Sequence, residues 1–129
     1  MNKICGLVAM LLAVSLTACA LLRSGGTEVV SLARQIDRTR PDSDLCSALT
    51  LTKAEVATYF SLADQVDPIA FHDEAMILPC SYRGTIRLAG QLYHWEIFAG
   101  GAGYLYDGAA VNKRYLCRER CLAALPNLR

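Results

Sequence analysis

The uncharged apolar run near the N-terminus constrains this chain most strongly, because it separates a targeting signal from the part of the chain that can fold in water. Lys3 supplies a small positive charge, and residues 4–16 that follow are dominated by Leu, Val, Ala and Met. A secretory signal peptide has a basic start and an apolar core of about 7–15 residues. The run therefore predicts an exported protein whose fold is built from the residues after it.

The end of this run, Leu16-Thr17-Ala18-Cys19, resembles the lipobox of bacterial lipoprotein precursors. In that family the cysteine thiol receives a diacylglyceryl group, the peptide is cut before the cysteine, and the freed amine is acylated. The resemblance implies that residues 1–18 are a signal peptide and that Cys19 is the lipidated first residue of the mature chain. Two or more acyl chains form a stable membrane anchor. Ala20, in place of the Asp that retains lipoproteins at the inner membrane, implies the outer membrane.

Two other interpretations of these residues stay open. Ala18-Cys19-Ala20 also satisfies a small-x-small cleavage site, which would release a soluble secreted protein. Residues 4–22 are uncharged for 19 residues, which is enough to span a bilayer as an uncleaved helix.

Length and charge limit the number of domains and the kinds of partner that the mature protein can have. Removal of residues 1–18 from the 129-residue chain would leave 111 residues, the size of one domain. Lys3 is the only charge removed, so 12 Lys and Arg would balance 12 Asp and Glu. A nucleic-acid-binding domain normally has a basic excess, so nucleic acid is not expected as a partner. Four basic residues lie close together near the C-terminus: Lys113, Arg114, Arg118 and Arg120. We expect them to form a solvated face; the alternative is that they bind acidic head groups or a partner.

Cysteine usage gives a second constraint. Cys5 leaves with the signal and Cys19 is consumed by lipid, so an even set remains for an oxidising compartment: Cys46, Cys80, Cys117 and Cys121. Four cysteines allow three connectivities, and the sequence alone does not choose among them. We favour Cys46–Cys80 with Cys117–Cys121, because an i, i+4 spacing on a helix places the Cα atoms about 6 Å apart. Neither pair has the CxxC spacing of a redox-active dithiol, so a structural role is expected.

We expect residues 19–45 to form a lipid-anchored tether and residues 46–129 to form a small periplasmic domain. Ser24-Gly25-Gly26 has the composition of a flexible linker, and residues 40–44 are a polar breaker. Between them, apolar residues recur at helical spacing, at positions 29, 32, 33 and 36. Residues 28–38 are therefore expected either as a short amphipathic helix or as part of a partly ordered linker.

One helix is predicted over residues 52–64. Thr52 and Glu55 match a capping box, in which each side chain bonds to the backbone N–H of the other residue. Val56, Tyr59 and the following apolar positions 60 and 63 form a stripe that faces a core. Asp67-Pro68 should lie at or past the helix end, and residues 68–78 are ambiguous.

The pattern becomes strand-like from residue 79 onward. Strands are expected over residues 80–83, 85–88, 91–99, 104–106 and about 114–116, followed by a short helix or turn that holds Cys121. In the longest strand, Tyr93 and Trp95 share one face, whereas His94 and Glu96 share the other. Because both faces carry bulk, this strand should be central. The expected fold class is α+β, with one short helix (about 52–64) packed on a small, disulfide-stapled antiparallel sheet.

A second, weaker resemblance concerns the region around two of the cysteines. Cys46 with Leu49-Thr50 and Ala54-Glu55-Val56, together with Pro79-Cys80-Ser81-Tyr82, is similar to small disulfide-linked bacterial lipoprotein domains of unknown function. In those domains a cysteine before a short helix pairs with one that enters the sheet, which implies Cys46–Cys80.

The chemistry of the remaining motifs is limited. His94 and Glu96 are candidates for a metal site, with His72-Asp73-Glu74 elsewhere, but no HExxH or other dense ligand motif occurs. Residues 100–103, rich in glycine, lack the Lys and Ser or Thr of a phosphate-binding loop and predict a hairpin loop. No catalytic residue is assigned and no cofactor is expected, because no G-x-S-x-G motif or comparable constellation is present.

Aromatic residues concentrate in the expected sheet, at positions 82, 93, 95, 98, 104 and 106. A sheet face that the helix leaves uncovered would expose several of them as a partner or ligand surface. We therefore expect an outer-membrane lipoprotein that faces the periplasm and serves as a non-enzymatic interaction module for an envelope protein partner. The expected surface comprises Tyr93, Trp95, Arg118 and Arg120. The alternatives are a small-molecule or metal-binding protein that uses His94 and Glu96, and an envelope hydrolase.

Overall fold

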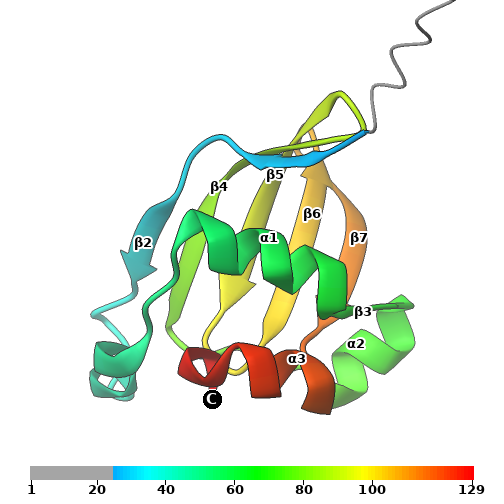
Figure 1. Cartoon of the computed structure of the whole chain (residues 1–129). Coiled ribbons are helices and arrows are strands. Elements are labelled where there is room, and N and C mark those ends of the chain that lie inside the picture. Colours follow the sequence, from blue (N-terminus) through cyan, green and yellow to red (C-terminus); the bar gives the residue numbers. More distant parts are fainter. Residues whose placement is uncertain (1–24) are drawn as a thin grey trace, which may run out of the picture.

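The computed structural model describes residues 25–129, which form an antiparallel sheet with short helices (Figure 1). The helices are α1 (Lys53–Leu62), α2 (Pro68–Glu74) and α3 (Glu119–Ala124), with two 3-10 turns, Ser43–Ala48 and Pro126–Leu128. The strands are β1 (Thr27–Val29), β2 (Ala33–Ile36), β3 (Asp64–Val66), β4 (Cys80–Leu88), β5 (Gln91–Phe98), β6 (Ala102–Asp107) and β7 (Ala110–Leu116). The predicted α+β class is confirmed.

The sheet has seven strands in the order β1-β4-β5-β6-β7-β3, and β2 pairs with β4 beside β1. Strands β4 to β7 form a meander of hairpins. Ala89 and Gly90 have φ values of 49° and 84°, as a two-residue turn between right-twisted strands requires. Residues 99–101 connect β5 to β6, which confirms the predicted hairpin, but the loop is shorter than the expected 100–103 because Ala102 and Gly103 belong to β6. Strand β5 lies between β4 and β6 and is central, as expected.

Helix α1 begins where the sequence predicts. The Thr52 hydroxyl accepts a hydrogen bond from the Glu55 N–H at 3.2 Å, and the Glu55 carboxylate accepts one from the Thr52 N–H at 2.8 Å. This reciprocal capping box satisfies two backbone donors that the first helical turn would otherwise leave free. The ambiguous segment after α1 forms β3 and α2, and Asp67 caps α2 through two backbone N–H groups.

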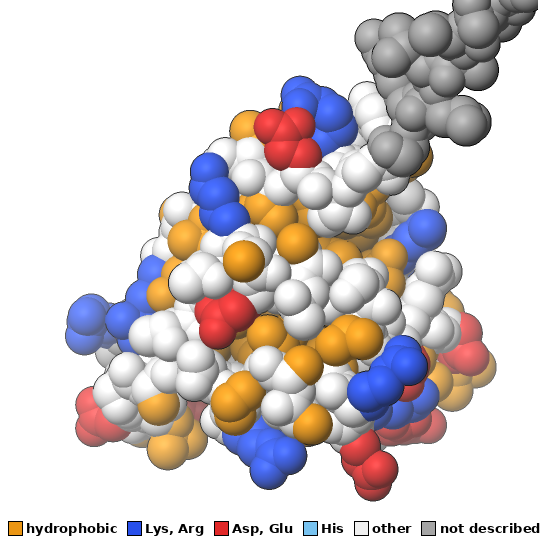
Figure 2. Space-filling view, in the orientation of Figure 1, with side chains coloured by type: hydrophobic (Ala, Val, Ile, Leu, Met, Phe, Trp, Pro, Cys, Tyr) orange, Lys and Arg blue, Asp and Glu red, His pale blue; other side chains and the backbone are white. Residues whose placement is uncertain are grey.

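The main core lies between one face of the sheet and α1, which crosses that face (Figure 1). Val56 and Tyr59 from α1 are fully buried there with Trp95 and Ile97 from β5. Seen from the helix side, charged side chains lie mostly toward the border of this face (Figure 2). The second face of the sheet is covered in part by α2 instead of α1. Phe71 of α2 packs near the β5–β6 end, in a cluster with Ala102 and Leu116.

The expected tether is corrected over residues 27–36, which form β1 and β2 at the sheet edge instead of a helix or linker. Val29 pairs with Ile86 and Ala33 with Arg83, so three residues of the edge face two of β4. The N–H groups of residues 30 and 31 both donate to the Thr85 carbonyl, at 2.9 and 3.2 Å, which marks a β-bulge. The extra residue of the bulge shifts the strand alternation by one position. The apolar residues on either side of it therefore fall at positions 29, 32, 33 and 36, a spacing that resembles that of a helix.

Gly84 lies beside this bulge, and β4 continues straight through it, whereas the sequence predicted a break there. A Cβ atom at residue 84 would overlap the backbone carbonyl of Ser31. The glycine is therefore explained by the close approach of the edge strand rather than by a turn. No helix among residues 25–129 is long and apolar enough to cross a membrane.

Candidate binding groove on the open sheet face

The second face of the sheet holds a groove where α2 does not reach. One hollow of about 670 Å³ is bordered by β2, β4, β5 and Tyr106 of β6. An adjoining hollow of about 350 Å³ extends toward Arg40 and Phe98. Both hollows are lined by Gln35, Arg83 and Glu96, so these residues occupy the middle of one elongated groove. Its volume falls in the range of ligand sites in proteins.

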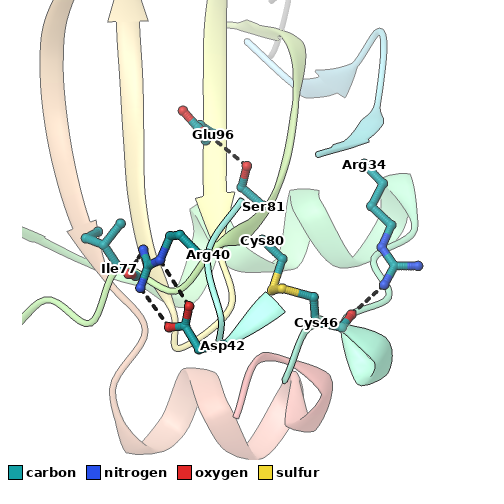
Figure 3. Close-up of a disulfide and its surroundings, with 8 residues drawn as sticks. All are labelled: Arg34, Arg40, Asp42, Cys46, Ile77, Cys80, Ser81 and Glu96. Carbon is teal, nitrogen blue, oxygen red and sulfur yellow. Dashed lines mark hydrogen bonds and ion pairs between the residues drawn. A yellow bond between two sulfur atoms is a disulfide. The ribbon is translucent and has the colours of Figure 1, made fainter. Parts of the chain in front are cut away.

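A buried carboxylate stands at the centre of the groove. Glu96 is only 9% exposed, and its Oε1 atom accepts a hydrogen bond from the Ser81 hydroxyl at 2.8 Å (Figure 3). Arg83 donates to the same oxygen from Nε at 3.2 Å and from Nη2 at 3.1 Å. Since a buried charge without partners is costly, these three bonds make the placement of Glu96 tolerable and fix its position.

Strand register brings this pair together. Arg83 and Glu96 are direct cross-strand partners, and Thr85 and His94 form the next pair on the same face. The two-residue turn at Ala89-Gly90 fixes that register. Paired strands in the middle of a sheet hold their side chains more rigidly than a loop would, so the groove is preorganised.

An aromatic side chain forms one wall of the groove. Tyr106 lies opposite His94 across the β5–β6 ladder, and its ring centroid is 5.6 Å from that of Tyr104. Burial, and to a smaller degree the Glu96 charge, raises the pKa of Tyr106 to about 12. The phenol therefore stays protonated at neutral pH and can donate a hydrogen bond toward the groove.

An ion pair and a disulfide stabilise the loops at the end of the groove near Arg40. Arg40 donates to both carboxylate oxygens of Asp42, at 3.1 and 2.7 Å, and to the Ile77 carbonyl at 3.2 Å (Figure 3). Cys46 and Cys80 are joined with their Cα atoms 5.5 Å apart, which fastens the first 3-10 turn to the start of β4. The loops at this end are therefore held against the sheet.

Both favoured disulfides are confirmed. Cys117 and Cys121 are also joined, with a Cα separation of 5.1 Å. The reason given from the sequence was partly wrong, because Cys117 precedes helix α3 and only Cys121 lies on it. The bond therefore fixes the turn from β7 into α3 rather than bridging one helical turn.

The expected interaction surface does not form one patch. Trp95 is 1% exposed in the core under α1, and its Nε1 has no hydrogen-bond partner among the described residues. Tyr93 is half-buried on the same covered face. Arg118 lies between α2 and α3, where it donates to Glu74 at 2.8 Å and to Asp64 at 3.3 Å. Arg120 is exposed on α3.

The metal-site candidates are separated in a similar way. His94 and Glu96 share the groove face, whereas His72 lies on α2 and bonds to its neighbour Asp73. Within residues 25–129, no group of three or more His, Cys, Asp and Glu side chains is placed to hold a metal ion. His94 and Glu96 are thus placed together as two members of a polar groove.

Sequence reasoning missed Arg83 and Ser81 as functional residues. A signal for Arg83 was present, because a two-residue turn at Ala89-Gly90 sets Arg83 opposite Glu96, whereas Ser81 pairs with Phe98. The lipidation candidate Cys19 lies outside the described residues. In comparisons with known proteins, no family model, curated protein or solved structure matches this chain.

Proposed function

We propose that this protein is a lipoprotein of the bacterial outer membrane, anchored through Cys19 on the periplasmic side, and that its domain is a non-enzymatic binding module. The lipobox-like sequence and its apolar leader support the anchor. The two disulfides support an oxidising compartment, where such bonds persist.

The observation that carries the binding function is the groove centred on Arg83 and Glu96. The Glu96 carboxylate is 9% exposed, whereas the Arg83 side chain bonded to it is 58% exposed, so the pair presents polar groups at the surface of the groove and is not sealed in the core. The adjoining open hollow leaves room for a ligand to reach these polar groups. The groove therefore replaces the Tyr93 and Arg118 surface as the site of interaction.

The anchor is tested by Cys19→Ser in the native host. We expect the variant to accumulate as an unprocessed precursor without fatty acid, whereas the wild type incorporates labelled palmitate and sediments with outer membranes. Normal cleavage of the variant, with release of a soluble protein, would instead support the alternative of ordinary signal cleavage.

The groove is tested by in-cell photo-crosslinking. A photoreactive amino acid replaces Gln35 or Thr85, which line the groove, and in control strains replaces Thr58 or Ser61 on α1. We expect an adduct of defined mass from the groove positions only. Equal adducts from α1, or none from either groove position, would count against the groove as the binding site.

A further inference from the structure

The charged side chains that line the groove balance in sign, Asp37 and Glu96 against Arg40 and Arg83, which restricts the ligands that the groove can take. The guanidinium of Arg83 is bonded to Glu96, and that of Arg40 is bonded to Asp42. An anion that approached Arg83 would also meet the Glu96 carboxylate, and a cation that approached Glu96 would also meet the Arg83 guanidinium. In either case, repulsion by the neighbouring like charge offsets part of the attraction. The groove is thus built for a ligand without net charge.

The uncharged lining of the same groove is rich in groups that both donate and accept hydrogen bonds. Gln35 supplies an amide and His94 supplies an imidazole. Ser31 and Thr85 supply hydroxyls that bond to each other at 2.9 Å and keep part of their hydrogen-bonding capacity for a ligand. The bonds from Ser81 and Arg83 to Glu96 all end on Oε1, and the Tyr106 phenol also lies within reach of this carboxylate. Ligand hydroxyls match such a surface, because each donates one hydrogen bond and accepts two.

The shape of the groove adds a second restriction. It runs along β4 and β5 through two adjoining hollows, so a chain-like ligand can fill it better than a compact one. The Tyr106 ring, backed by Tyr104, presents a flat apolar surface beside the polar groups. An aromatic face with a polar tip suits a ligand whose rings have apolar faces and polar edges.

We infer that the groove binds a neutral saccharide chain, with hydroxyls bonded to the Arg83–Glu96 pair and one ring packed on Tyr106. This inference rests on the proposed function, because it names the ligand class of the same groove. Sugar rings meet all three requirements, since they carry no charge, bear hydroxyls at their edges and present C–H groups on their faces. Strands β4 and β5 hold the two charged partners in register before the ligand arrives, which lowers the ordering cost of binding.

The test uses the full chain, labelled with ¹⁵N and held in a detergent that has no sugar head group. The neutral probes are the β-1,4-linked tetramers of N-acetylglucosamine and of glucose, and the charged probe is tetragalacturonate. We expect saturable NMR shifts at groove amides, including those of Thr85 and His94, with at least one neutral probe. Tetragalacturonate should bind more weakly by about tenfold or more.

Variants locate the binding. Tyr106→Ala should lower the affinity for the neutral probe by about tenfold or more. His94→Ala should also lower this affinity, and because the His94 side chain is exposed, its removal should not disturb folding. Glu119→Gln on α3 is the matched control and should bind as the wild type does. Absence of saturable shifts with both neutral tetramers would overturn the inference, as would tetragalacturonate binding as tightly as they do.

The outcomes separate this inference from the proposed function. If crosslinks persist at Gln35 and Thr85 while neither neutral tetramer binds, the saccharide assignment is overturned and the binding module stands. A protein identified in those crosslinks would then be the occupant of the groove. Loss of both signals would overturn the saccharide assignment and the proposed groove together.

Discussion

The Tyr59 hydroxyl of α1 donates a hydrogen bond of 2.9 Å to the carbonyl oxygen of Gly101 in the β5–β6 turn. This bond joins the helix to the sheet inside the core, across 42 residues of sequence. Gly103 makes room for it, because a Cβ atom there would overlap the Tyr59 hydroxyl. Burial raises the pKa of Tyr59 above its usual range, so the phenol remains a neutral donor.

We expect Tyr59→Phe to lower the free energy of unfolding by about 0.5–1.5 kcal/mol, because the Gly101 carbonyl loses this donor and keeps only the bond from the Cys117 N–H. Urea denaturation followed by circular dichroism measures the change. Tyr93→Phe is the matched control, since the Tyr93 hydroxyl bonds to no other group in the described part of the chain, and its effect should be close to zero. Equal stability of Tyr59→Phe and wild type would show that the bond contributes nothing net.

The two disulfides should contribute unequally. They close spans of 34 and 4 residues, so the chain-entropy relation gives about 4 kcal/mol for Cys46–Cys80 and about 2 kcal/mol for Cys117–Cys121. The comparison is between the double variants Cys46→Ala/Cys80→Ala and Cys117→Ala/Cys121→Ala in chemical denaturation. All four cysteines are buried, so side-chain removal affects both pairs similarly. The opposite order of stability would contradict the entropic account.

Arg118 and Arg120 should differ although they are two residues apart. Arg118 donates to Glu74 and Asp64, which raises the pKa of its guanidinium and links α2 to β3, whereas no ion pair involves Arg120 in residues 25–129. We therefore expect Arg118→Glu to lower the melting temperature and Arg120→Glu to leave it nearly unchanged. High salt should narrow the difference between the variants. Identical melting curves at low salt would show that the Arg118 network has no net effect.

Alkaline pH should destabilise the protein through Tyr106. Its pKa of about 12 in the folded state exceeds the ordinary value of 10.0, so the folded chain keeps a proton that the unfolded chain releases. The free energy of unfolding should therefore fall as the pH rises from 10 to 12. Tyrosinate absorbance measures this titration, and subtraction of the Tyr106→Phe curve isolates the residue. A difference curve centred near pH 10 would contradict a protected Tyr106.

Much of the local structure followed from short-range patterns. The capping box at Thr52 and Glu55 placed the start of α1, because its two hydrogen bonds involve residues only three apart. Strand alternation placed Trp95 and Glu96 on opposite faces, because side chains of a strand point alternately to either side. Both favoured disulfides were also right, one of them for a partly wrong reason.

The sequence by itself therefore determined the α+β class, the main helix and the central hairpins, and it left a lipid anchor at Cys19 as a prediction. Only the tertiary structure decided which polar and aromatic residues remain accessible. Helix α1 buries Trp95, whereas α2 stops short of Arg83 and Glu96 on the other face. The edge strands could not be anticipated, because the bulge at Ser31 depends on pairing with residues 54 positions away. The groove and the edge strands both depend on contacts between residues that are far apart in the sequence, and no local sequence pattern encodes such contacts.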